Sequence, residues 1–260
     1  MELQKIDQQK DRCSFIVKGT NPAYMNTIRR LIMTEVPTMA IKSVKFITNT
    51  SAMYDEMVAH RLGLVVLKTD LEGYEVADPA TPLADLGAVH AVDLSLKAEG
   101  PCTVYAEMLQ SRDPKIKPVY PKTIIAKLTK GQSLEIEAKA VLGRGKNHVK
   151  HTPGLVYYRG NPQIKVDPKE DTAGVVALCP TKVFKADGRK AVVEKPLACI
   201  LCMACADAYP ESISVKGSEE DFVMFIESWG QLSLTEMMNQ AAEELNSKVD
   251  EFSKALKNVK

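Results

Sequence analysis

The chain has 260 residues, of which 45% are hydrophobic and 26% are charged, and its formal net charge is +1. This composition is that of a globular protein with one large or two to three small domains. The small net charge argues against a general electrostatic attraction to nucleic acid, and no apolar run is long enough to span a membrane. Because no signal peptide opens the chain, we expect a cytoplasmic protein.

The N-terminal part predicts a strand, a helix and a second strand. Residues 13–18 are strand-like, and Asn21 followed by Pro22 is a typical helix start. The helix should run over Asn21–Glu35, because the residue before Pro37 leaves the helical region. Its apolar face repeats at spacings of three and four, through Met25, Ile28, Leu31 and Ile32. Residues 39–47 then alternate like a strand.

The middle of the chain, residues 48–165, is predicted to be mostly β, with proline-rich joints. Alternating polarity predicts strands over Val89–Leu96, Thr103–Leu109 and Leu134–Val141. A short helix is expected over Tyr54–Leu62, with Met57, Val58 and Leu62 on one face. Residues 142–151 are basic and contain glycine, but they lack the pattern of a phosphate-binding loop. We favour a solvated loop there, and contact with a partner stays open.

Four cysteines suggest an iron–sulfur site. Cys199, Cys202 and Cys205 form a CxxCxxC run, and Cys179 precedes Pro180. In two-cluster ferredoxins the fourth cysteine of each run ligates the other run's cluster, so Cys179 is expected to complete this set. The matching positions of a second site hold residues that cannot bind iron in such a cluster: Lys169, Thr172, Val175 and Tyr209. We therefore expect one [4Fe–4S] cluster.

Other uses of these cysteines are less favoured. Zinc also takes four thiolates, but its usual framework is two separated CxxC pairs. Disulfides are disfavoured because cytosolic thiols stay reduced, and free thiols remain the last alternative. Cys13 and Cys102 lie alone in apolar stretches and are expected to be inert core residues.

The C-terminal part predicts a strand and a long helix. Residues 222–226 are strand-like, Gly230 breaks the strand, and Ser233 with Glu236 forms a capping box. The helix over Ser233–Lys257 carries a nearly heptad apolar seam: Leu234, Met238, Ala241, Leu245, Val249, Phe252 and Leu256. The seam either packs on its own domain or meets a partner helix. We favour the partner, because the seam outlasts any nearby strand that could cover it.

Four segments, in order along the chain, resemble the α-like subunits of cellular RNA polymerases. The first is Gly19–Ile41, with the pair Arg29-Arg30 before Pro37, and the second surrounds His60-Arg61-Leu62-Gly63. The third and fourth are Gly143–Pro153 and Phe225–Ser233. A ferredoxin-like insertion between the third and fourth segments points to the archaeal, D-type member of the family.

The resemblance implies an α+β fold whose dimerisation domain is built from both chain ends, residues 1–47 and 218–260. A mostly β domain (48–165) and a ferredoxin-like [4Fe–4S] domain (166–217) would be inserted between them. It further implies a heterodimer with the small subunit L, on which the large subunits and further small subunits assemble. The catalytic aspartates of the polymerase belong to its largest subunit. No catalytic residue and little direct contact with nucleic acid are therefore expected here.

Partner contacts are expected from both helices, through Met25, Ile28, Arg29, Arg30, Leu31, Ile32, Met238, Ala241, Leu245, Val249, Phe252 and Leu256. The arginine pair should face a large subunit, although an exposed pair without a role is the alternative. The expected cluster would staple a small insertion, or redox-regulate assembly. The competing hypothesis is a redox-sensing, oxygen-sensing or electron-transfer iron–sulfur protein.

Overall fold

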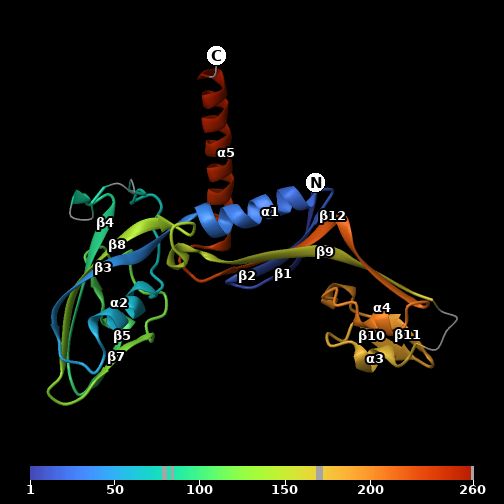
Figure 1. Ribbon diagram of the computed structural model, residues 1–260, viewed down its shortest axis with the longest axis horizontal. Coiled ribbons are helices and arrows are strands. Elements are labelled where there is room, and N and C mark those ends of the chain that lie inside the picture. Colours follow the sequence, from blue (N-terminus) through green and yellow to red (C-terminus); the bar gives the residue numbers. More distant parts are fainter. Residues whose placement is uncertain (78–80, 83–84, 168–171, 259–260) are drawn as a thin grey trace. The chain divides into compact units, whose positions relative to one another are not determined.

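The computed structural model describes residues 1–77, 81–82, 85–167 and 172–258. They form two compact units, whose elements are labelled in Figure 1. The first unit comprises residues 1–8, 13–27 and 157–225, and the second comprises residues 9–12, 28–156 and 226–260. Both units mix helices with strands, which agrees with the mixed α/β character expected from the sequence.

Most of a four-stranded sheet, in the order β1-β2-β12-β9, belongs to the first unit. Its strands are β1 (Glu2–Gln8), β2 (Arg12–Lys18), β12 (Ile213–Ser228) and β9 (Gly154–Val166). Aromatic side chains link neighbouring strands β9 and β12: the rings of Tyr157 and Phe225 stack with centroids 4.7 Å apart, and Tyr158 meets Phe222 edge to face. Such cross-strand aromatic pairs stabilise a sheet beyond backbone hydrogen bonding.

Short elements between β9 and β12 form a small body within the first unit. They are α3 (Val175–Leu178), β10 (Phe184–Asp187), β11 (Lys190–Val193), the 3-10 turn η5 (Pro196–Ala198) and α4 (Ala204–Ala208). β10 and β11 pair as an antiparallel hairpin. The buried core of this body is small and mostly apolar: Val175, Val183, Phe184, Ala191, Cys199, Cys205, Ile213 and Val215.

The second unit is built around a four-stranded sheet in the order β3-β8-β4-β6. The strands are β3 (Pro37–Asn49), β8 (Ser133–Arg144), β4 (Ala91–Glu99) and β6 (Gln110–Ser111). The helix α2 (Asp55–Gly63) and the pair β5 (Cys102–Tyr105) and β7 (Ile124–Leu128) complete this layer. The main core lies between the sheet and these elements: alternate residues of β4 and β8 are buried in one cluster with Val58 and Leu62 of α2, and α2 itself contacts β3 and β7.

The predicted N-terminal helix begins where the sequence indicates. Asn21 caps it, since its Oδ1 accepts the backbone N–H of Tyr24 at 2.9 Å. The helix is not uniform, however: α1 (Pro22–Arg30) continues into η1 (Leu31–Glu35), which is one turn of π-helix. In that turn the N–H of Val36 donates to the carbonyl of Leu31 at 3.2 Å, five residues back. The turn places Glu35 in a buried position.

The predicted C-terminal helix is α5 (Leu234–Asn258). Its capping box is confirmed in both directions: the N–H of Ser233 donates to the carboxylate of Glu236 at 2.7 Å, and the N–H of Glu236 donates to the Ser233 hydroxyl at 3.2 Å. Gly230, with a φ of +95°, makes the turn that separates the helix from β12.

Several expectations about the middle of the chain need correction. Residues 103–109 do not form one strand, since β5 ends at Tyr105 and the 3-10 turn η3 (Ala106–Met108) follows. Residues 142–151 are not simply a solvated loop: β8 extends to Arg144, and a 3-10 turn, η4 (Val149–His151), ends in the buried His151. On α2, Val58 and Leu62 are buried as expected, but Met57 is exposed.

Candidate assembly surface

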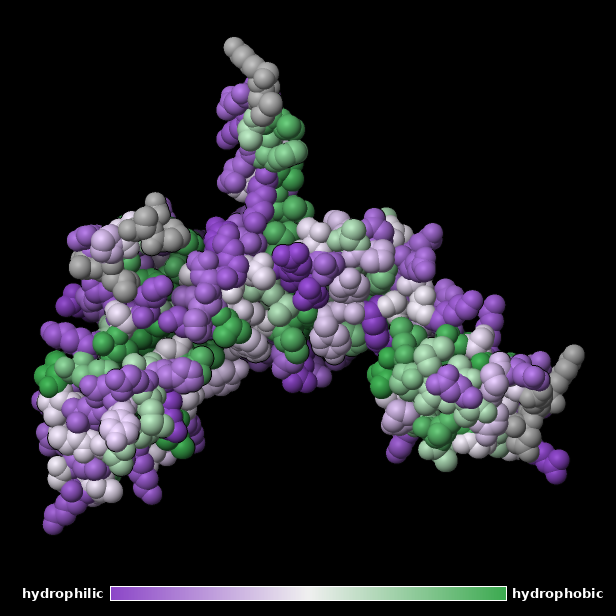
Figure 2. Space-filling model, in the orientation of Figure 1, coloured by the Kyte–Doolittle hydropathy of each residue, from purple (hydrophilic) through white to green (hydrophobic). Residues whose placement is uncertain are grey.

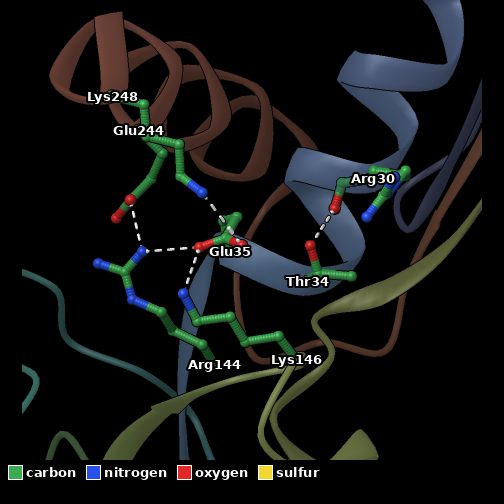
Figure 3. Close-up of polar contacts among 7 residues, drawn as sticks. All are labelled: Arg30, Thr34, Glu35, Arg144, Lys146, Glu244 and Lys248. Atoms are coloured by element: carbon green, nitrogen blue, oxygen red, sulfur yellow. Dashed lines mark hydrogen bonds and ion pairs between the residues drawn. The ribbon is translucent and has the colours of Figure 1, made fainter. Parts of the chain in front are cut away.

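An ion network joins η1 to α5 inside the second unit (Figure 3). Its centre is Glu35, which is only 8% exposed. The Glu35 carboxylate accepts from Arg144 Nη1 at 3.2 Å, from Lys146 Nζ at 3.1 Å and from Lys248 Nζ at 3.2 Å. Burial would raise the pKa of Glu35, but the hydrogen bonds from Lys146 and Lys248 outweigh it and hold that pKa below its usual value.

Arg144 bridges the two carboxylates of this network. Its Nη1 contacts Glu35 and also Glu244 on α5. Burial would lower the pKa of Arg144, but the hydrogen bonds to Glu244 and Glu35 raise it, so the guanidinium stays charged. Three cations therefore hold two carboxylates, and α5 is fixed to η1 in one rotational setting. The arrangement also leaves a polar hollow of about 530 Å³ beside the network.

The loop after β8 supports η1 through its backbone. The N–H of Lys146 donates to the carbonyl of Thr34 at 3.0 Å. A side chain at Gly145 would drive its Cβ into the carbonyl oxygen of Met33, so this position needs glycine. Gly145 and Lys146 are thus explained by the close approach of the loop to η1.

A buried histidine anchors the same loop to β3. His151 Nδ1 lies 2.8 Å from the carbonyl oxygen of Thr38, and the Thr38 hydroxyl donates to the carbonyl of His151 at 2.7 Å. A Cβ at Gly143 would lie 2.6 Å from the His151 ring, so glycine is required there as well. Burial is the main cause that lowers the pKa of His151 to about 4, and its ring is neutral at pH 7.

The first half of α5 buries apolar side chains in its own unit, whereas the second half contacts that unit through the ion pair of Lys248 with Glu35. Met237 and Ala241 are buried, and Met238 and Leu245 are half-buried. Every described residue of α5 from position 246 onward is exposed. The apolar residues of that exposed half lie along one side of the helix, opposite a hydrophilic side, as Figure 2 shows. We name Val249, Phe252 and Leu256 the distal seam; they are 53%, 64% and 55% exposed.

The residues expected to contact partners fall into three groups. Four of them are buried in their own units, namely Met25, Leu31, Ile32 and Ala241. Four are half-buried, namely Ile28, Arg29, Met238 and Leu245, and four are exposed, namely Arg30, Val249, Phe252 and Leu256. Arg29 Nη1 approaches the sulfur of Met33 at 3.8 Å. The backbone carbonyl of Arg30 accepts the Thr34 hydroxyl (Figure 3).

The expected iron–sulfur site is wrong. Among the described residues, no group of three or more His, Cys, Asp or Glu side chains is placed to hold a metal ion. Cys199 and Cys205 are buried in the small apolar core, Cys179 is half-buried and Cys202 is exposed. The Sγ of Cys179 accepts the N–H of Val183, and that of Cys199 accepts the N–H of Leu201, each at 3.4 Å.

The thiols therefore act as core and surface side chains of this body. Burial raises the pKa of Cys205, as it does that of the half-buried Cys13. Thr172 and Val175, two of the positions compared with a second cluster site, are buried, and the Thr172 hydroxyl accepts the N–H of Ala191 at 2.9 Å. Tyr209 is half-buried. Lys169 lies outside the described residues.

The ion network is a feature that sequence patterns do not reveal. Its members are far apart along the chain: Arg144 is 109 residues from Glu35 and 100 residues from Glu244. One local signal exists, because Glu244 and Lys248 are four residues apart on a predicted helix and therefore share a face. Nothing local indicates that Glu35 would be their partner.

Comparison with known proteins identifies the family. The chain is 35% identical to DNA-directed RNA polymerase subunit Rpo3 of Methanobrevibacter smithii, over 97% of each chain. It is 34% identical to subunit Rpo3 of Pyrococcus horikoshii, over 100% of this chain and 99% of the relative. The chain belongs to the Rpo3 family of archaeal DNA-directed RNA polymerase subunits. Residues 44–158 also match the model of the RNA polymerase Rpb3/RpoA insert domain.

These matches confirm the α-like family that the four segments indicated, and they correct two finer expectations. The relatives carry the name Rpo3, so the expected D-type assignment is wrong. The expected function included a [4Fe–4S] cluster, which the arrangement of the described cysteines overturns. As a member of this family the chain is part of an RNA polymerase complex with other subunits. Among the described helices, none is both long and apolar enough to cross a membrane.

Proposed function

We propose that this chain is a non-catalytic assembly subunit whose helices α1, η1 and α5 pair with a smaller polymerase subunit, subunit L. The pair would carry the large subunits and further small subunits in the cytoplasm, with little direct contact to nucleic acid. In this proposal residues 1–47 and 218–260 form the pairing domain, residues 48–165 form the insert, and residues 166–217 form a separate small body without a cluster.

The observation that supports pairing most directly is the distal seam of α5. Val249, Phe252 and Leu256 follow each other at spacings of three and four, so they line one side of the helix over about 10 Å. All three are more than half exposed. A contiguous apolar stripe on an exposed helical segment with a hydrophilic opposite side is typical of a protein–protein interface. A second helix with the same spacing would bury it by knobs-into-holes packing.

The contacts of α5 with its own unit support the proposal in a different way. The capping box fixes where the helix begins, and the contacts of Glu244 and Lys248 with the η1 network fix its rotation. The direction in which the distal seam faces is therefore set before any partner arrives. A preorganised helix loses less conformational entropy on binding than a disordered segment would.

The proposal is tested by Phe252→Glu in a chain co-expressed with its small partner subunit. A carboxylate within the seam would have to be buried without a counter-charge, and the apolar contact of the ring would be lost. We expect pairing to weaken about 100-fold or more, from the loss of a buried aromatic side chain alone. Affinity is measured by titration with the purified small subunit, and pairing by analytical sizing.

The matched control is Asn258→Glu, which adds the same charge two residues beyond Leu256, on another side of α5. It should pair like the parent chain. Circular dichroism should show unchanged helix content for both variants, since Phe252 is exposed and carries no contact within its unit that folding needs. Unchanged affinity of Phe252→Glu would disprove pairing through the distal seam.

A further inference from the structure

The second unit has a basic depression that is lined by residues outside α5. Two adjoining hollows, of about 130 and 450 Å³, lie beside β3 and the loop after β8. Both hollows are lined by Lys42, His148 and Lys150. The smaller one also contacts His60 near the end of α2. No aspartate or glutamate occurs among the described residues that line either hollow.

The two lysines of this depression lack an anionic partner within the described part of the chain. No ion pair among those residues includes Lys42 or Lys150. Lys150 is half-buried, and its Nζ donates to the carbonyl of Ile41 at 2.7 Å. This hydrogen bond holds the ammonium group against the side of the smaller hollow. Burial lowers the pKa of Lys150, and the nearby charge of Lys42 lowers it further. A carboxylate placed between the two lysines would counteract both effects, because an opposite charge favours the charged form of the ammonium.

We infer that this depression receives an acidic segment of another polymerase subunit, with its Asp or Glu side chains on Lys42 and Lys150. The inference rests on the proposed function, because it supplies a second contact for assembly, made by residues other than those of α5. Ammonium–carboxylate hydrogen bonds are charge-assisted and gain strength where the lysine is already partly desolvated. The neutral His151 ring and the apolar side chains of Val76 and Leu86 also line the larger hollow.

A protein segment suits the depression better than nucleic acid does. Specific or non-specific binding to a duplex relies on several phosphate contacts spread along a basic surface. Here the charge is confined to a concave site with two lysines, and the chain as a whole has a net charge of only +1. The larger hollow has room for one or two side chains of a docked loop.

The first test is a zero-length cross-link in the complete polymerase, purified through a tag on this chain. A water-soluble carbodiimide joins a lysine amine to a carboxylate in contact with it, and the carbodiimide leaves as a urea. Mass spectrometry should find amide links from Lys42 or Lys150 to aspartate or glutamate of another subunit.

The second test compares Lys42→Glu with Lys130→Glu in the same complex. Lys42 is exposed, so its replacement does not disturb the core, whereas Lys130 is an exposed lysine in the turn before β8. Lys42→Glu should weaken retention of the contacting subunit at least tenfold in a salt-dependent manner, and Lys130→Glu should leave it unchanged. Lys42→Gln should fall between the parent chain and Lys42→Glu.

The outcomes separate this inference from the proposed function. If Phe252→Glu pairs with the small subunit as tightly as the parent chain does, the proposed function fails. If the chain enters the complex but Lys42→Glu behaves like Lys130→Glu, only the acidic-segment inference fails. The inference also fails if Lys42→Glu retains all subunits and instead loses binding of a labelled DNA duplex.

Discussion

Replacing Glu35 by glutamine tests the ion network that joins η1 to α5. Glutamine keeps the size of the side chain and removes the charge that three cations share. The Glu35 side chain is 10% exposed, while those of Arg144, Lys146 and Lys248 are 24%, 49% and 44% exposed. Of these three cations only Arg144 is mostly buried, and in the Glu35→Gln variant it keeps Glu244 as an ion-pair partner.

These exposures set the expected size of the effect. Breaking a fully buried ion pair costs about 3–5 kcal/mol, and an exposed pair contributes about 0–1 kcal/mol. The two lysines are screened by water, so we expect the second unit to lose about 2 kcal/mol of unfolding free energy, between those limits. The matched control is Glu243→Gln, an exposed glutamate that lines the same hollow, which should change stability by less than about 0.5 kcal/mol.

The assay is urea unfolding followed by fluorescence of Trp229, the single tryptophan, which lies in the second unit just before α5. The difference between the parent chain and Glu35→Gln should also depend on pH. Since the pKa of folded Glu35 is held below its ordinary value, its contribution is present at neutral pH and is lost as the pH falls through the folded pKa. A variant as stable as the parent chain at pH 7 would refute the view that the network holds α5 on η1.

Two further predictions concern the loop after β8. Because the pKa of folded His151 is about 4 and the ordinary value is 6.5, the unfolded chain binds the proton more readily, and stability should fall as the pH drops from 6.5 toward 4. The loss should be about 2 kcal/mol between pH 7 and pH 5 by the Trp229 assay, and His151→Gln should flatten this dependence. Gly145→Ala should destabilise the second unit by about 3 kcal/mol or prevent its folding, because the added Cβ meets the carbonyl of Met33. The control is Gly87→Ala, whose Cβ meets no atom of the described residues within 4 Å, and it should melt like the parent chain in calorimetry. Equal melting of both variants would contradict the steric argument.

The elements that the sequence predicts correctly are those determined by residues close together in the chain. Helices α1 and α5 begin at caps formed within three residues, by Asn21 and by Ser233, and the alternation in β4 and in the first part of β8 comes from one buried face. β9 escapes prediction because Gly160 and Pro162 interrupt its pattern. The π-turn escapes prediction because a spacing of three and four fits an ordinary helix equally well.

The candidate assembly surface likewise has one part that the sequence predicts and one part that it does not. The distal seam of α5 is predictable, since its residues recur along one helix. The contacts of Glu35 are not, because its partners come from β8, the following loop and α5. For the cysteines, by contrast, the sequence predicted a metal site that the described residues do not form. Their spacing suggested a shared metal, but ligands must also converge in space, and the described thiols divide between a core and a surface.

The π-turn η1 gives the junction between α1 and β3 a tolerance to residue count that an ordinary helix lacks. A π-turn holds one residue more than an α-helical turn between two ends that keep nearly the same direction. Removing one residue before Glu35 would therefore change the hydrogen bond of Val36 from a five-residue to a four-residue span. Glu35 would keep nearly the same direction toward its cations, and β3 would keep its register with β8. Length variation of one residue within this family should therefore occur at η1 as well as in the connections between strands.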